Sequence, residues 1–196
     1  MERAKIESEE SSVSSAQRIF ANEKAARGAF LALQERFWRV AEWNDCSGIS
    51  QFALFDEKGG ACQSGIFSEN LFVRVYLKGS GKYDWVKVVE TAESEREAFL
   101  KVRPTFDPTD QSAEKAAVSH FFAGETSNNF CLTREENQID LYVVGLNEKQ
   151  NTAETKNALE TVRNVLTVNV GSFLGIQKAE WETFCRNFLD SASSKS

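Results

Sequence analysis

Hydrophobic residues recur at two periods along the chain, and these periods predict which segments are helices and which are strands. Over residues 14–44 apolar side chains return every three or four positions, the period of an amphipathic helix. The same period returns over residues 152–170 and 178–189. Between residues 49 and 144, short segments rich in Val and aromatic residues alternate with polar positions, which is typical of strands. The pattern therefore predicts long helices at both ends and a sheet between them.

Short polar connections join the strand segments. The predicted strands cover residues 49–55, 61–67, 71–78, 83–91, 98–103, 130–133 and 139–144, of which 61–67 is the weakest. A proline-containing loop and a short helix over residues 112–122 interrupt them. Hairpin connections imply antiparallel neighbours, and the strand-helix-strand rhythm of a parallel sheet is missing. The predicted fold class is α+β, with a curved antiparallel sheet of about six or seven strands packed against long N- and C-terminal helices.

The order of these elements resembles that of helix-grip domains. The resemblance rests on element order alone, so it implies an architecture and assigns no activity. Residues 14–190 form one predicted domain, because a chain of 196 residues fits a single domain of ordinary size. Residues 1–13 and 191–196 contain too little apolar surface to fold and are predicted to be disordered tails.

Composition narrows the classes of partner. Hydrophobic residues make up 41% of the chain and aromatic residues 11%, which indicates a soluble globular protein. The formal net charge of -6 argues against binding to nucleic acid or to an anionic membrane surface. The N-terminal segment is acidic and rich in Ser, and no apolar run approaches the length of a signal or a membrane span. We therefore expect a cytoplasmic protein.

The residues that usually carry metal or catalytic chemistry are sparse. Cys46, Cys62, Cys131 and Cys185 form no closely spaced pair, and His120 is the only histidine. We therefore predict no metal site, no cofactor and four reduced thiols. No known catalytic motif is present, so no catalytic residue is assigned and enzymatic activity is left open. If the protein is an enzyme, His120 is the first candidate for general acid–base catalysis.

The hairpin of residues 71–91 predicts a sheet with two unlike faces. If Ser80 and Gly81 form a two-residue turn, Tyr76 lies opposite Trp85 and Arg74 lies opposite Lys87. The other face is aliphatic and is predicted to pack, as core, on the helix of residues 152–170; its members are Val73, Val75, Val86, Val88, Leu100 and Val102. The basic and aromatic face is the candidate ligand-binding site, with Arg74, Tyr76, Trp85, Lys87, Lys101 and Arg103 as its residues.

Three explanations of this basic face remain open. Like charges that face each other across strands destabilise a sheet, so a compensation is expected. Carboxylates of a covering element, such as Glu35 or Glu42, could neutralise the cations. Alternatively the face is open to water, with long side chains shielding the aromatic rings. In the third explanation it binds an anionic ligand.

The leading functional hypothesis is a non-enzymatic domain that binds a small, partly apolar, anionic or amphipathic ligand on this face or in a cavity. The competing hypothesis is a protein–protein interaction or assembly module, with a homodimer as one form. An enzyme with an active site around His120 is the third.

Overall fold

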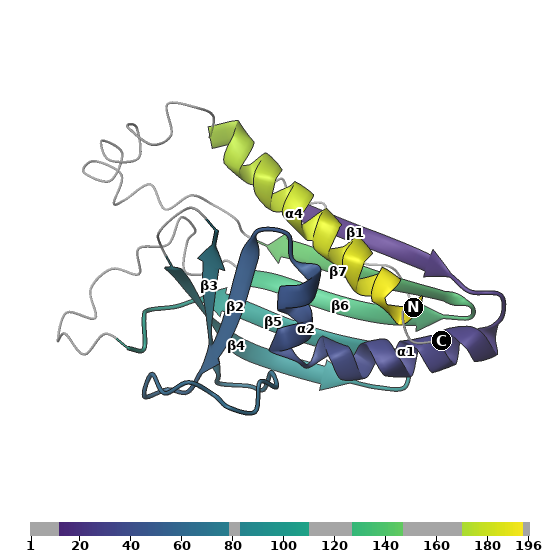
Figure 1. Ribbon diagram of the computed structural model, residues 1–196, viewed down its shortest axis with the longest axis horizontal. Helices are drawn as coiled ribbons and strands as arrows, with labels where there is room; N and C mark the ends of the chain where they lie inside the picture. Colours follow the sequence, from purple (N-terminus) through teal and green to yellow (C-terminus); the bar gives the residue numbers. More distant parts are fainter. Residues whose placement is uncertain (1–11, 79–82, 110–126, 147–169, 194–196) are drawn as a thin grey trace.

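The fold is a curved antiparallel sheet with helices on one face (Figure 1). A computed structural model describes residues 12–78, 83–109, 127–146 and 170–193. The strands are β1 (Ser12–Ile19), β2 (Ser50–Phe55), β3 (Phe72–Leu77), β4 (Tyr83–Glu93), β5 (Glu97–Pro104), β6 (Ser127–Glu135) and β7 (Gln138–Leu146). The helices are α1 (Glu23–Phe37), α2 (Val40–Cys46) and α4 (Val170–Asp190), and a 3-10 turn follows at Ser191–Ser193.

The seven strands lie in the order β1-β7-β6-β5-β4-β3-β2, and each pairs antiparallel with its neighbours. From β2 to β7, strands that follow one another in the chain are neighbours in the sheet, and short connections join β3 to β4, β4 to β5 and β6 to β7. The helices α1 and α2 link the two edge strands, β1 and β2. The long helix α4 lies against β1 and β7 and reaches α2 (Figure 1).

The prediction of one helix over residues 14–44 is wrong. β1 begins at Ser12 and pairs along its whole length with β7, from Ser12 opposite Gly145 to Ile19 opposite Gln138. Helix α1 begins only after Asn22, whose side-chain oxygen accepts a hydrogen bond from the backbone N–H of Ala25 at 2.9 Å. Long-range pairing with β7 outweighs the local helical period in this segment. The expected N-terminal helix is thus preceded by a strand, and residues 12 and 13 belong to the sheet.

Most of the predicted strands are confirmed, with ends that differ by a few residues. Segment 61–67 is the exception, since it contributes only two isolated bridges, Arg39 to Ile66 and Phe55 to Ala61. The predicted helix over 178–189 lies within α4. The helix predicted over 112–122, with His120, lies outside the described residues. So does the helix predicted over 152–170, except for its last residue, together with the packing of the sheet on it. None of the helices in the described part of the chain is long and apolar enough to cross a membrane.

The core lies between the sheet and the helices, as the alternation in β3, β4 and β5 predicts. Val88 and Leu100 are fully buried, and Val73 and Val102 nearly so, while Val75 and Val86 pack at its margin. Trp43 of α2 lies at the centre of an aromatic cluster. Its ring centroid is 4.6 to 5.7 Å from those of four Phe residues: Phe52, Phe67, Phe130 and Phe184. Rings fill this part of the core.

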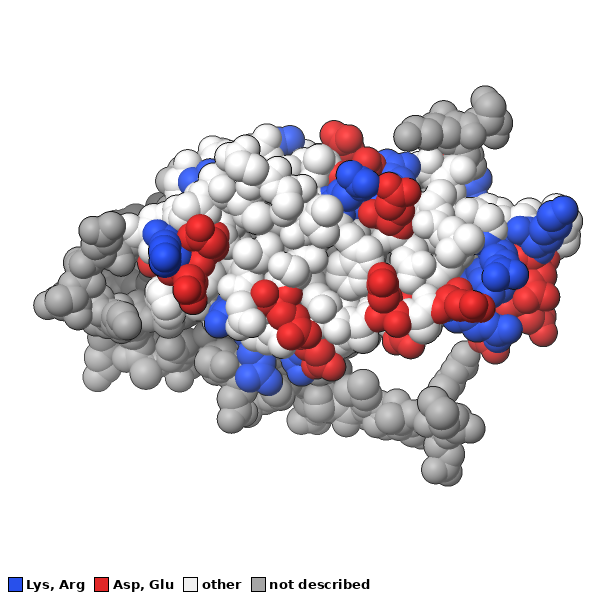
Figure 2. Space-filling model, turned by 90° about the horizontal axis from the view of Figure 1, so that it is seen from below, with Lys and Arg blue, Asp and Glu red and all other residues white. Residues whose placement is uncertain are grey.

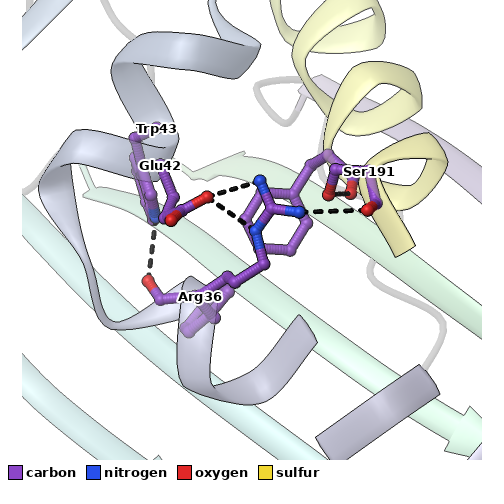
Figure 3. A network of polar contacts seen from close by, with 6 residues as sticks. Arg36, Glu42, Trp43 and Ser191 are labelled. Atoms are coloured by element: carbon purple, nitrogen blue, oxygen red, sulfur yellow. Dashed lines mark hydrogen bonds and ion pairs between the residues drawn. The ribbon is translucent and has the colours of Figure 1, made fainter. Parts of the chain in front are cut away.

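A polar network ties the three helices together (Figure 3). Arg36 of α1 forms an ion pair with Glu42 of α2, with Nε 2.6 Å from the carboxylate oxygen. The same guanidinium donates to the backbone oxygen of Ser191 at 3.1 Å, just after α4. Trp43 Nε1 donates to the backbone oxygen of Phe37 at 2.8 Å. These bonds fix the junction of α1, α2 and α4 over the core.

Side chains from the helices close the free edge of β2. Asn44 bonds both backbone groups of Phe52, accepting from its N–H at 2.6 Å and donating to its oxygen at 2.9 Å. Glu180 of α4 accepts from the N–H groups of Ile49 and Ser50 at 3.0 and 3.1 Å and from Ser47 Oγ at 2.5 Å. Partial burial would raise the pKa of Glu180, but these hydrogen bonds outweigh it and hold the pKa below its ordinary value. The carboxylate anchors α4 to the start of β2.

Candidate ligand-binding face

The register of the β3–β4 hairpin differs from the predicted register by two residues. Arg74 lies opposite Trp85, and Tyr76 opposite Tyr83, so the predicted pairs of Arg74 with Lys87 and Tyr76 with Trp85 are wrong. Because the shift is even, each side chain keeps its predicted face. The observed register separates Arg74 from Lys87 and places each of them against aromatic rings instead.

A cross-strand row of two aromatic and two basic residues runs across the outer face, the face without helices. Phe55 of β2 lies opposite Phe72 of β3, Phe72 opposite Lys87 of β4, and Lys87 opposite Arg103 of β5. We call these four residues the outer row. The predicted like-charged pair of Arg74 with Lys87 is therefore absent, and Lys87 lies opposite Arg103 instead.

Aromatic rings form a floor under the cations. Phe55, Phe72 and Trp85 make a small buried cluster on this face, with the rings of Phe55 and Trp85 5.0 Å apart. Phe106, in the segment after β5, packs 5.7 Å from Phe72 and keeps 46% of its surface exposed. The floor is thus buried at its centre and open at Phe106.

The basic side chains lie over these rings. The Arg74 guanidinium is 4.9 Å from the Phe55 ring centroid and 4.6 Å from that of Tyr83, and Lys87 Nζ is 5.6 Å from Phe72. Such cation–π contacts hold a charge on an apolar surface without neutralising it. Within the described part of the chain, none of the four predicted cations (Arg74, Lys87, Lys101 and Arg103) forms an ion pair.

Two of the predicted site residues lie at the margins. A bulge at Val89 shifts the pairing of β4 with β5, so that Lys101 lies opposite Glu90 and away from Lys87. Tyr76 packs on Tyr83, with ring centroids 5.3 Å apart, at the other end of the β3–β4 pair. The structure therefore brings together Arg74, Trp85, Lys87 and Arg103.

The proposed neutralisation by Glu35 or Glu42 is wrong. Glu35 pairs with Arg39 at 2.7 Å, and Glu42 pairs with Arg36, in the helices on the opposite face of the sheet. Figure 2 shows another view of the surface, on which charged side chains lie in small groups and uncharged areas separate these groups. The two remaining explanations are an open, self-shielded face and a ligand-binding face.

Four aromatic residues of this face are not among the site residues that the sequence predicts. Phe72 and Tyr83 have the same parity as Arg74 and Trp85, so alternation alone could have placed them there. Phe55 required the pairing of β2 with β3, and Phe106 lies in a loop, where no periodicity exists.

The described residues offer little for catalysis. No group of three or more His, Cys, Asp or Glu in this part of the chain could hold a metal ion. Burial raises the pKa of Cys46 to about 11 and that of Cys185 to about 12, which keeps these thiols protonated. The outer row presents two cations side by side, and Phe106 next to it presents exposed apolar surface.

Comparison with known proteins bears on the fold alone. No protein-family model matches the chain, and no curated protein sequence matches it. A hypothetical protein of Helicobacter pylori, jhp0584, is similar in structure, with a TM-score of 0.54, 8% identity, and coverage of 92% of this chain and 88% of that one. This similarity supports the curved antiparallel architecture.

Weaker similarities have TM-scores below 0.5. The Aha1 dimer of Colwellia psychrerythraea has a TM-score of 0.46 and 11% identity, with 94% of this chain and 99% of that one covered. The Zhui aromatase/cyclase of Streptomyces sp. R1128 has a TM-score of 0.42 and 12% identity, with 93% of each chain covered.

Proposed function

We propose that the protein is a non-enzymatic binding domain that takes a small, partly apolar anion on the outer row. The anionic group lies between Lys87 and Arg103, and the apolar part lies against the half-exposed ring of Phe106, which packs on the buried Phe72. Arg74, above Phe55, provides a further positive charge at the far end. A cytoplasmic location remains a prediction from the sequence.

The observation that carries this proposal is the direct pairing of Lys87 with Arg103, without a carboxylate partner among the described residues. Like charges opposite each other on a sheet cost on the order of a few tenths of a kcal/mol. A bound anion removes this cost and gains two charge-assisted hydrogen bonds. The half-exposed Phe106 ring adds apolar surface next to the cations.

The spacing of the row limits the size of the ligand. Adjacent strands lie about 4.8 Å apart, so the three intervals from Phe55 to Arg103 span about 14 Å. A saturated chain of roughly ten carbon atoms spans most of this length and a bicyclic aromatic ring system is shorter, so both stay within it. Medium-chain fatty acids and bicyclic aromatic carboxylates are the classes that fit.

Thermal melts with decanoate and 1-naphthoate test the proposal. We expect the parent to melt at a higher temperature with at least one of these anions, and Lys87→Gln and Arg103→Gln to lose most of that shift. Without ligand, both variants should be as stable as the parent or slightly more stable, because a repulsion is removed. Binding should weaken with added salt in the parent more than in the variants.

Arg27→Gln, at an exposed position of α1, is the matched control and should keep the ligand shift. The proposal fails if neither anion shifts the parent. If both Gln variants melt at lower temperatures than the parent without ligand, Lys87 and Arg103 have a carboxylate partner, and the proposal fails.

A protein–protein module is the alternative, and one observation favours it. β1 is an edge strand, and its Val13 and Ile19 are exposed by 51% and 65%. Apolar side chains on a free sheet edge are typical of a pairing surface. Light scattering coupled to gel filtration distinguishes the two functions, since this alternative predicts a dimer that Val13→Lys dissociates.

A further inference from the structure

The bulge in β4 turns two polar side chains toward the helices. Val88 lies opposite Val102, and after the extra residue Val89 the pairing resumes with Glu90 opposite Lys101. Thr91 and Glu93 then lie opposite Leu100 and Ala98, which are buried on the helix side of the sheet. Without the bulge, both would have pointed to the outer face.

Thr91 and Glu93 line an open hollow between β4, the segment before β3 and the end of α1. Its volume is about 310 Å³, and its walls are Trp38, Phe67, Ser68, Thr91, Ala92 and Glu93. Trp38 Nε1 donates to Glu93 Oε2 at 2.9 Å, which fixes the carboxylate beside the indole. Phe67 is anchored by its N–H, which donates to the backbone oxygen of Trp38 at 2.8 Å.

The hollow is negative in charge. Of the described residues that line it, Glu93 alone is charged. Glu69 lies next to it, because its carboxylate accepts from the backbone N–H of Thr91 at 3.1 Å. Arg39, the residue after Trp38, forms an ion pair with Glu35. An indole ring and a carboxylate therefore share one solvent-accessible hollow without a basic side chain in its walls.

We propose that this hollow binds an organic cation, an alkylammonium or guanidinium group. The Trp38 ring offers its π-face, Glu93 offers charge, and Phe67 and Ala92 contact the apolar part of the ligand. Both the cation–π contact and the exposed ion pair are weak, so a dissociation constant of roughly ten to a hundred millimolar is expected. This site lies on the helix side of the sheet and does not depend on the outer row.

The indole N–H signal of Trp38 in a ¹H–¹⁵N spectrum provides the test, assigned with Trp38→Phe. Tetramethylammonium and methylguanidinium are titrated separately against sodium at equal ionic strength. We expect both organic cations to shift this signal in a saturable manner while sodium does not. A short Lys- or Arg-containing peptide, added in a second arm, reveals whether a protein side chain can supply the cation.

Glu93→Gln keeps an oxygen to accept the indole hydrogen bond but removes the charge. It should weaken binding by up to about fivefold. Glu95→Gln, in the turn after β4, is the matched control and should bind like the parent. Absence of a saturable shift in the parent overturns the proposal, and so does equal binding by Glu93→Gln and the parent.

Discussion

Val88 and Val89 are adjacent in the chain but have different surroundings. Val88 is fully buried in the core, whereas Val89, the extra residue of the bulge, is 39% exposed. This extra residue places Lys101 opposite Glu90 and turns Glu93 toward Trp38. One position in β4 thus shapes both candidate sites.

Truncation of these two valines should have unequal effects. Val88→Ala removes two buried methyl groups and should lower the free energy of unfolding by about 1 to 3 kcal/mol. Val89→Ala should change it by less than about 0.5 kcal/mol. Urea denaturation of both variants provides the comparison. Equal losses would mean that the two faces of β4 are assigned incorrectly.

The thiols should differ in reactivity. All four cysteines are free, and Cys46, Cys131 and Cys185 have raised pKa values of about 11, 12 and 12. Burial is the main cause in each, and at Cys131 the Glu97 carboxylate adds to it. At pH 8 these three thiols stay protonated and react slowly. Cys62, partly exposed beside Ser64, should react first.

An aromatic disulfide reagent at pH 8 should therefore titrate one fast thiol in the native protein and four after denaturation. Cys62→Ser should abolish the fast phase. Two or more fast thiols in the parent would contradict the raised pKa values of Cys46, Cys131 and Cys185.

At the scale of elements, the helices hold the sheet by its edge strands. Glu180 is the main polar link from α4 to β2, and its lowered pKa means that the charged form stabilises the fold. That stability is fully present above the ordinary pKa of 4.5 and is lost as the pH falls through the lower folded value.

Glu180→Gln should therefore destabilise the protein at pH 7 by about 1 kcal/mol, a modest value because the group is partly exposed to solvent. The difference from the parent should shrink as the pH falls below 4.5. Thermal melts between pH 3 and 7 measure it, with Glu182→Gln on the same helix as control. A difference that is independent of pH would contradict the role of the charge.

The sequence predicts the strands of this fold better than its helices. Alternation of apolar residues is a local signal, and it locates β2 to β7 within a few residues. β1 was missed because Ile19 and Phe20 fit the helical period of α1, while its true partner, β7, lies over a hundred residues away. Pairing over such a distance leaves no local pattern in the chain.

For the whole molecule, the two faces of the sheet could be predicted but the register could not. The alternation of side chains along each strand assigned four residues to one face: Arg74, Trp85, Lys87 and Arg103. A shift of the register by two residues leaves this assignment unchanged. Their neighbours depend on the length of the β3–β4 connection and on the bulge at Val89, and neither has a clear sequence signal. The predicted pair of Arg74 with Lys87 was wrong, because the register places Lys87 opposite Arg103.

The ligand's position on the sheet is the central claim, and intermolecular NOEs with 1-naphthoate test it most directly. With isotope-labelled protein and unlabelled ligand, we predict NOEs from the naphthyl protons to the ring protons of Phe72 and Phe106 on the outer face. These NOEs should disappear in the Lys87→Gln/Arg103→Gln double variant. NOEs to Trp43 and Phe130 in the core, or no NOEs at saturating ligand, would contradict the account.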